Sequence, residues 1–241
     1  MLTNAGLPTY VEERGSGPAL LFLHGACEWI GFADPVVDVL SESFRVVQAE
    51  RRGHGRTPDV PGELHYADMA ADTAALIEQL ELAPVDLIGY SDGGIIGLVL
   101  AIERPELLRR LVAIGVNARV DGLTDASIEW LDAATPDTWT AAAREAYQRL
   151  SPDGPEHWPV VCEKVRRMLL REPSLADDEL RSIRTPTLIV GGDRDDIRAD
   201  HLLELHRLIP DSQLAILPDA GHELPVTEPV RLADLVARFL A

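Results

Sequence analysis

The sequence predicts an α/β protein with a mostly parallel sheet that is covered by helices on both faces. Short apolar runs of strand length recur along the chain, as in residues 19–23 (ALLFL) and 85–90 (VDLIGY). Segments with apolar residues at helical spacing lie between these runs, as in residues 66–82. Loops rich in glycine, proline and arginine, such as 51–62, separate the two kinds of segment. Strands that alternate with helices are typical of a parallel sheet with helical crossovers.

The first half of the chain predicts strands and helices in alternation after an initial edge strand. The helix over 66–82 depends on the spacing of Tyr66, Met69, Ala70, Thr73, Ile77 and Leu80. In chain order, we expect an edge strand over 8–14, a turn over 15–18, a buried strand over 19–23, a loop over 24–31, a helix over 34–40, a strand over 44–49 and the helix over 66–82.

The second half continues the alternation but contains one interruption. The expected elements are strands over 85–90, 111–116, 187–190 and 213–217, and helices over 92–103, 200–208 and 229–240. Residues 118–184 contain no strand-like run, and prolines interrupt their helical stretches. We therefore predict a core made of residues 1–117 and 185–241, with a small helical cap over 118–184. We expect this cap to pack over one edge of the sheet.

Composition excludes several classes of protein. The 241 residues carry 22 Lys and Arg against 40 Asp and Glu, a net charge of −18, which repels the phosphates of nucleic acids. No run of 18 apolar residues predicts a membrane span, and residues 1–10 show no signal-peptide pattern. Two distant cysteines predict neither a disulfide framework nor a metal site. We expect a cytoplasmic monomer or homodimer without a membrane or nucleic-acid partner.

The strongest chemical signal is Gly89-Tyr90-Ser91-Asp92-Gly93, a G-x-S-x-G motif between a predicted strand and a predicted helix. Such a sharp turn forces its central residue into a strained backbone, and the glycines leave room for it. The Ser91 hydroxyl then projects above the carboxyl end of the sheet. The Asp92 amide lies at the start of the helix, where it can donate to an oxyanion.

A nucleophilic serine needs a base and an acid that orients the base. His222 is the candidate base, because it follows the last predicted strand and Gly221 allows a close approach. Three carboxylates compete for the role of the acid after the preceding strand. We favour Asp195 over Asp193 and Asp196, because a residue two or three positions beyond the strand can fold back toward a histidine.

The order Ser91, Asp195, His222 resembles that of the α/β-hydrolases, and further motifs extend the resemblance from residue 19 to the C-terminus. The resemblance implies that the Ala26 amide is a second oxyanion donor and that His24 and His54 shape loops. The matching segments are His24-Gly25-Ala26, the turn ERRGHGRT at 50–57 with Glu and Thr where the family has Asp and Ser, Gly192-Asp193-Arg194-Asp195, Gly221-His222, and Glu228-Pro229.

A serine nucleophile predicts acyl transfer on an ester, thioester or lactone through an acyl-enzyme, with no metal or organic cofactor. The expected partner is a small, ester-like substrate. A C–C bond hydrolase and a cofactor-free perhydrolase (haloperoxidase) use the same triad and stay open as alternatives. A ligand-binding receptor with a slow triad is the alternative from another class.

Two further expectations concern how the substrate is bound. The Asp92 side chain, next to Ser91, could attract a cationic substrate group, although a carboxylate that complements the helix dipole is an equally good interpretation. Apolar and aromatic residues are candidates for the pocket lining. These are Trp29, Ile30, Ile95, Trp130, Trp139, Met168 and Leu224.

Overall fold

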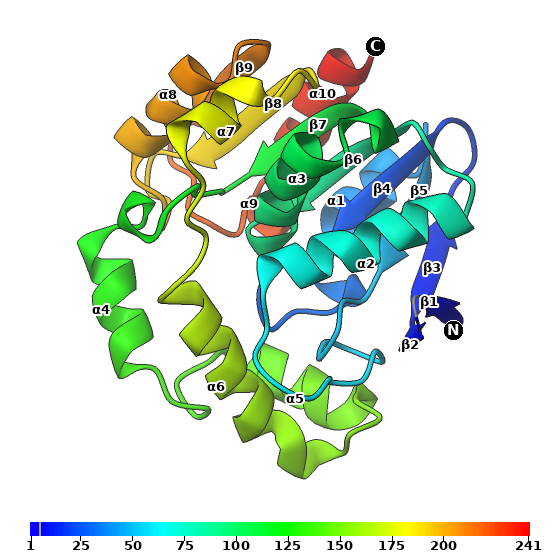
Figure 1. Ribbon diagram of the computed structural model, residues 1–241, viewed down its shortest axis with the longest axis vertical. Coiled ribbons are helices and arrows are strands. Elements are labelled where there is room, and N and C mark those ends of the chain that lie inside the picture. The colour runs from blue at the N-terminus through cyan, green and yellow to red at the C-terminus, as the bar shows by residue number, and fades with distance from the viewer. Residues whose placement is uncertain (5) are drawn as a thin grey trace.

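The centre of the molecule is a seven-stranded sheet with the strand order β3-β5-β4-β6-β7-β8-β9 (Figure 1). The computed structural model describes residues 1–4 and 6–241. All neighbouring strands are parallel except β3, which runs antiparallel to β5 at one edge. The strands of this sheet are β3 (Val11–Arg14), β4 (Ala19–Leu23), β5 (Arg45–Ala49), β6 (Val85–Tyr90), β7 (Leu108–Ile114), β8 (Thr187–Gly192) and β9 (Ser212–Leu217).

Helices cover both faces of the sheet, which confirms the predicted fold class. Helices α2, α3, α7 and α8 cover one face, and α1, α9 and α10 cover the other (Figure 1). The bounds are α1 (Asp34–Leu40), α2 (Tyr66–Gln79), α3 (Asp92–Glu103), α4 (Asp125–Ala133), α5 (Ala141–Leu150), α6 (Trp158–Leu169), α7 (Asp177–Ser182), α8 (Ala199–Leu208), α9 (Leu224–Thr227) and α10 (Pro229–Leu240).

The core has two layers because successive residues of a strand point to opposite faces. In β4, Leu21 and Leu23 pack with the residues of α2 and α3, whereas Leu20 and Phe22 pack with those of α1 and α10. All four side chains are buried. This two-sided burial explains why the central strands are continuous apolar runs.

The predicted edge strand over 8–14 is wrong as one element. The chain instead forms β2 (Leu7–Thr9), which pairs with β1 (Leu2–Asn4), and then β3. The break falls at Tyr10, whose amide donates to Thr57 Oγ1 and whose carbonyl accepts from the Glu50 amide. These bonds tie Tyr10 to the loop after β5.

Smaller differences concern the ends of elements. Strand β7 begins at Leu108 and ends at Ile114, before Gly115 with its positive φ. Helix α2 ends at Gln79, because the chain reverses at Glu81, which also has a positive φ. Strand β8 continues through Gly191 and Gly192, which still pair with β9.

Residues 120–182 contain α4 to α7 and connect β7 to β8. Helices α4, α5 and α6 lie together at one end of the sheet in Figure 1. The sequence predicts that this segment packs over an edge of the sheet, but the helices lie at the end of the sheet instead. The reason is that the segment leaves from the carboxyl end of β7, which is an interior strand between β6 and β8.

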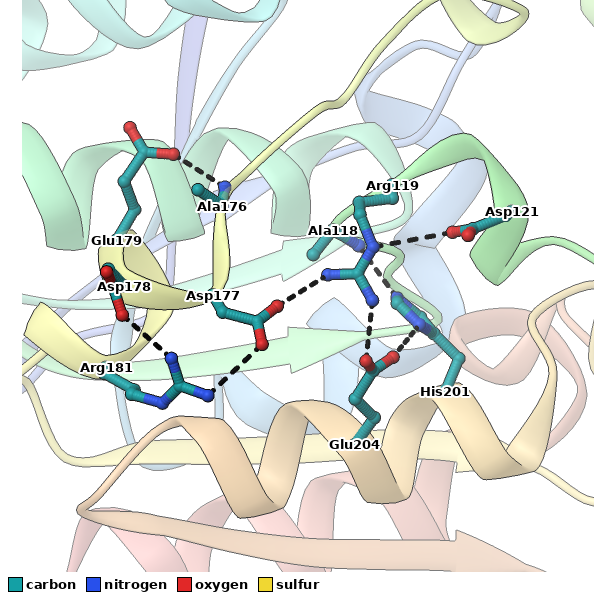
Figure 2. Close-up of polar contacts among 10 residues, drawn as sticks. All are labelled: Ala118, Arg119, Asp121, Ala176, Asp177, Asp178, Glu179, Arg181, His201 and Glu204. Carbon is teal, nitrogen blue, oxygen red and sulfur yellow. Dashed lines mark hydrogen bonds and ion pairs between the residues drawn. The ribbon is translucent and has the colours of Figure 1, made fainter.

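The two ends of the helical segment meet at Arg119. An antiparallel bridge joins Arg119 to Ser174. The Arg119 guanidinium contacts Glu204 of α8 at 2.7 Å and Asp177 of α7 at 3.4 Å (Figure 2). His201 of α8 accepts from the Ala118 amide at 3.0 Å and contacts Glu204. The entry of the segment is therefore fastened to α8, and its exit is fastened to the entry through Arg119.

The far side of the helical segment is fastened to the loop between β5 and α2. Lys164 of α6, the only lysine of the chain, lies 2.6 Å from both Asp59 Oδ2 and the Val60 carbonyl. His157 contacts the same Asp59 oxygen at 2.9 Å. The Lys164 and Asp59 side chains are only 10% and 7% exposed, so this ion pair is shielded from water.

Among the helices of residues 1–4 and 6–241, none has the length and apolar character needed to cross a bilayer.

We predict that Lys164→Ala lowers the free energy of unfolding by about 2–3 kcal/mol, because it leaves the shielded Asp59 carboxylate short of a partner. Urea denaturation followed by circular dichroism measures this loss. The control is Arg171→Ala, which removes an exposed cation of the same segment. A loss for Lys164→Ala no greater than that of the control would contradict the importance of this ion pair.

Candidate active site

Ser91 is the single residue between β6 and α3, and its backbone is strained. Its φ of 52° and ψ of −118° lie in a region that non-glycine residues rarely adopt. Gly89 and Gly93 permit this turn, because a Cβ on Gly89 would collide with the Gly93 carbonyl and one on Gly93 with the Leu23 carbonyl. The Ser91 amide donates to the Ile114 carbonyl at 2.8 Å. Ser91 is thereby held at the carboxyl end of the sheet.

Ser91, His222 and Asp195 form a continuous hydrogen-bonded series. His222 Nε2 lies 3.1 Å from Ser91 Oγ, and His222 Nδ1 lies 2.6 Å from Asp195 Oδ1. An ionised carboxylate only accepts, so Nδ1 carries the hydrogen and Nε2 of the neutral ring is free to accept from the hydroxyl. The arrangement can therefore remove a proton from Ser91.

Asp195, and not its two neighbours, contacts the histidine. Its Oδ2 accepts from the Gly192 amide and its Oδ1 from the Ile197 amide, which fix the side chain below the imidazole. Asp193 instead accepts from the Ala220 amide, and Asp196 accepts from the Ser127 hydroxyl. Both of these residues are exposed.

Electrostatics favour a charged His222 beside an ionised Asp195. Burial opposes protonation of the imidazole, but the hydrogen bond and the charge of Asp195 raise the pKa of His222 above its usual value of 6.5. Burial also opposes ionisation of Asp195, but the contacts with His222 and the two amides hold the pKa of this carboxyl below its usual value. A proton that His222 takes from Ser91 is thus stabilised.

The loop 25–27 presents one backbone amide to the site because its other two amides, of Gly25 and Cys27, already donate hydrogen bonds. The Gly25 carbonyl accepts from Arg51 Nη2 at 2.6 Å, and the Cys27 amide donates to His54 Nε2 at 3.1 Å. The amides of Ala26 and Asp92 have no hydrogen-bond acceptor among the described residues. Both residues line the cavity that contains Ser91. They are positioned to donate to an oxygen anion there.

His24 and His54 are neutral supports of this loop. Burial and the charge of Arg51 lower the pKa of His54 to about 3 and that of His24 well below its usual value. His54 Nε2 accepts from Cys27, so its Nδ1 donates to the Arg52 carbonyl. His24 Nε2 accepts from the Arg51 amide, and its Nδ1 contacts the Gly25 carbonyl. Neither ring contacts Ser91.

The Asp92 carboxylate is held inside the protein by Tyr66 and Arg51. It is fully buried, Oδ1 accepts from the Tyr66 hydroxyl at 2.7 Å, and Oδ2 lies 3.6 Å from Arg51 Nη2. Burial raises the pKa of Asp92, against the effect of Arg51. The hypothesis that this side chain contacts a cationic substrate group is therefore not supported by the structure.

A cavity of about 490 Å³ lies between Ser91 and the helical segment. Its walls come from the loops at the carboxyl ends of the strands and from helices α3 to α6. The lining residues are Ala26, Cys27, Glu28, Phe32, Tyr90, Ser91, Asp92, Ile95, Asn117, Leu123, Ala126, Ser127, Trp130, Leu131, Trp139, Thr140, Ala143, Leu169, Asp196, Ile197, His222 and Glu223.

Three of the seven predicted pocket residues line this cavity, and four do not. Ile95, Trp130 and Trp139 line it. The rings of the two tryptophans pack edge to face, with their centroids 5.2 Å apart. Trp29 instead packs edge-on against Phe32. Ile30, Met168 and Leu224 are buried in the core, 2%, 3% and 0% exposed. On α6, Leu169 lines the cavity in place of Met168 because the rotation of the helix turns Met168 inward.

Sequence reasoning missed Glu28, Phe32, Tyr90 and Asn117, which also line the cavity. Two of them could have been found. Tyr90 directly precedes the nucleophile candidate, and Glu28 is a lone acid in the apolar stretch that follows the His24-Gly25-Ala26 segment.

Comparisons with known proteins agree with this fold. The model of the alpha/beta hydrolase family matches residues 20–235. A Rhizobium rhizogenes protein with the provisional name carbamate hydrolase RutD is 30% identical over 86% of both chains. The 2-hydroxy-6-oxo-2,4-heptadienoate hydrolase of Pseudomonas putida is 29% identical over 100% of this chain and 95% of its own. The structure of a thermophilic esterase from Thermogutta terrifontis is 25% identical with a TM-score of 0.74, covering 97% of this chain and 93% of that one.

We predict that His222 titrates above pH 6.5 and that Asp195→Asn lowers its pKa, because the variant loses the hydrogen bond and the charge that most strongly oppose the effect of burial on the ring. Nuclear magnetic resonance of the imidazole signals measures both values. The rings of His24 and His54 serve as internal references that stay neutral. An unchanged His222 pKa in the variant would exclude Asp195 as the group that stabilises the charged ring.

Proposed function

The chain belongs to the alpha/beta hydrolase family, and we propose that it is a serine hydrolase that cleaves carboxylic esters through an acyl-enzyme on Ser91. The observation that carries this proposal is the hydrogen-bonded series from Asp195 through His222 to Ser91. This series ends in a cavity of about 490 Å³, beside the backbone amides of Ala26 and Asp92, which have no hydrogen-bond acceptor among the described residues. Serine, base and acid in this order supply a nucleophile without any other group.

Acylation begins when His222 Nε2 takes the proton of Ser91 Oγ. The Oγ then bonds to the ester carbonyl carbon, and the electron pair of the C=O bond moves to the oxygen. The tetrahedral intermediate collapses, the bond to the leaving oxygen breaks, and that oxygen takes the proton from Nε2. An acyl-enzyme on Ser91 and a free alcohol result.

Deacylation repeats these steps with water. His222 takes a proton from a water molecule, whose oxygen attacks the acyl carbon. When the second intermediate collapses, Ser91 Oγ leaves and receives the proton from Nε2. The carboxylic acid product departs and the serine is restored.

The amides of Ala26 and Asp92 stabilise the negative oxygen of both intermediates. Each donor of this kind is worth roughly 3 kcal/mol of barrier. The Asp92 amide also lies at the N-terminus of α3, where the helix dipole favours negative charge. The helical segment over Ser91, with Trp130 and Trp139 at the cavity, acts as a cap that shields the reaction from water.

The cavity favours uncharged substrates over carboxylates. Among the described residues that line it, none is a lysine or arginine, whereas Asp196 and Glu223 carry exposed carboxyl groups. The Pseudomonas putida relative is named for a substrate that is itself a carboxylate. A substrate of that kind would meet no lysine or arginine among the described lining residues, so ester cleavage is the better proposal than cleavage of a C–C bond in an anionic acid.

We predict that Ser91→Ala lowers turnover of p-nitrophenyl acetate at least about 10³-fold, because the acyl-enzyme cannot form. Release of p-nitrophenolate measures the rate. Ser43→Ala, on the exposed connection between α1 and β5, serves as the matched control. Turnover that survives in Ser91→Ala would overturn the proposal.

Oxidation of halide that requires added peroxide, without ester hydrolysis, would favour the perhydrolase. Ligand binding without any turnover would favour the receptor.

We predict that an anionic ester is a poorer substrate than a neutral ester of similar size. The expected kcat/KM for mono-p-nitrophenyl succinate is about tenfold or more below that for p-nitrophenyl butyrate, because the exposed carboxyl groups of Asp196 and Glu223 at the cavity repel its charge. Rates are divided by the spontaneous hydrolysis rate of each ester. A preference for the succinate ester would contradict this substrate class and would favour the anionic acids of the C–C hydrolases.

A further inference from the structure

Glu28 combines a partly buried carboxyl group with a place in the cavity that contains Ser91. Its side chain lines the cavity, and its Oε2 accepts from the Gly25 amide at 2.7 Å. A side chain at residue 25 would crowd the Glu28 carboxyl and the Tyr90 ring, so these two groups lie next to the Gly25 backbone. Glu28 therefore touches the loop that carries the Ala26 amide from the cavity side.

The loop 25–27 is held at three points, and Glu28 supplies one of them. The Gly25 carbonyl is held by Arg51 and His24, and the Cys27 amide by His54. The third point is the Gly25 amide, which only Glu28 binds among the described side chains. The bonds of Arg51, His24 and His54 fix the two peptide planes that flank Ala26, and the bond of Glu28 fixes the preceding plane, between His24 and Gly25. The Ala26 amide is the N–H group of the loop that they leave free for the substrate.

We propose that Glu28 is a positioning residue that holds the Gly25 amide, and so aims the Ala26 N–H at the oxyanion, and that its ionisation switches the site off. This inference rests on the proposed serine hydrolase function. A carboxyl oxygen accepts the Gly25 hydrogen bond in either protonation state. The anion, however, would place a full negative charge beside the negative oxygen that the two amides must stabilise.

The surroundings of Glu28 set where this ionisation occurs. Burial raises the pKa of Glu28 to about 8, and the Gly25 amide opposes that effect. The charged or titratable groups around it are His222 before α9, Arg51 after β5, Asp92 at the start of α3 and Tyr90 of β6. His222 and Arg51 lower the pKa of Glu28, and Asp92 raises it. The carboxyl is thus neutral at pH 7 and becomes an anion as the pH passes about 8, which predicts falling kcat there.

His24, His54 and Arg51 cannot supply such a switch. The two histidines stay neutral because their pKa values are lowered, and an arginine stays charged throughout the accessible pH range. Glu28 is the member of this support whose charge changes near neutral pH. Its effect should therefore appear in kcat above pH 8 rather than as a change in KM.

The test compares two variants of Glu28 over pH 6–10, with p-nitrophenyl butyrate as the substrate. Glu28→Leu removes the acceptor for Gly25 and is expected to lower kcat about tenfold at pH 7, with KM changed less than about twofold. Glu28→Gln keeps an acceptor oxygen but cannot ionise. It should restore kcat at least about fivefold relative to Glu28→Leu and should lack the fall in kcat above pH 8.

Glu42→Gln is the control, because it removes one carboxylate at an exposed position outside the cavity. Its pH profile should keep the fall above pH 8. A wild-type kcat in Glu28→Leu would overturn the positioning role, and a fall above pH 8 that persists in Glu28→Gln would overturn the switch. If Glu28→Leu does not fold, the profile of Glu28→Gln still decides. Either negative result, with turnover still lost in Ser91→Ala, overturns this inference and leaves the serine hydrolase function standing.

Discussion

The backbone of Ser91 is the constraint on which the rest of the site depends. A turn of one residue between β6 and α3 is possible only with a positive φ at that residue and with no side chains at Gly89 and Gly93. The same turn places the serine hydroxyl above the sheet and leaves the Asp92 amide free at the start of a helix. Strain in one residue thus provides both a nucleophile and a donor for the charge that its attack creates.

Parallel strands bring the remaining groups to this point, because their carboxyl ends share one rim of the sheet. Asp195 follows β8, His222 follows β9 and the loop 25–27 follows β4. Each group is then fixed by local bonds. Backbone amides hold Asp195, and neutral histidines, Arg51 and Glu28 hold the loop. The helical segment closes the rim from above and leaves the apolar cavity in which the polar groups converge.

The sequence was enough to predict residues whose place follows from the course of the backbone. It was not enough to predict the direction of a side chain that depends on residues distant in sequence. Strand alternation and chain order led to Ser91, Asp195 and His222, which the structure places in contact. The inward direction of the Asp92 carboxylate depends on Tyr66 and Arg51, which are distant in sequence. The choice between Met168 and Leu169 depends on the rotation of α6. The raised pKa of Glu28 depends on burial by elements that no local pattern reveals.

The central claim is that Ser91 carries the acyl group during turnover. Rapid acid quenching of the reaction with p-nitrophenyl butyrate, followed by mass spectrometry of the peptides, tests it directly. The account predicts a butyryl group on the peptide that contains Ser91, together with an early burst of p-nitrophenolate if deacylation is the slower step. Steady hydrolysis in which the acyl group is found on another residue would contradict it.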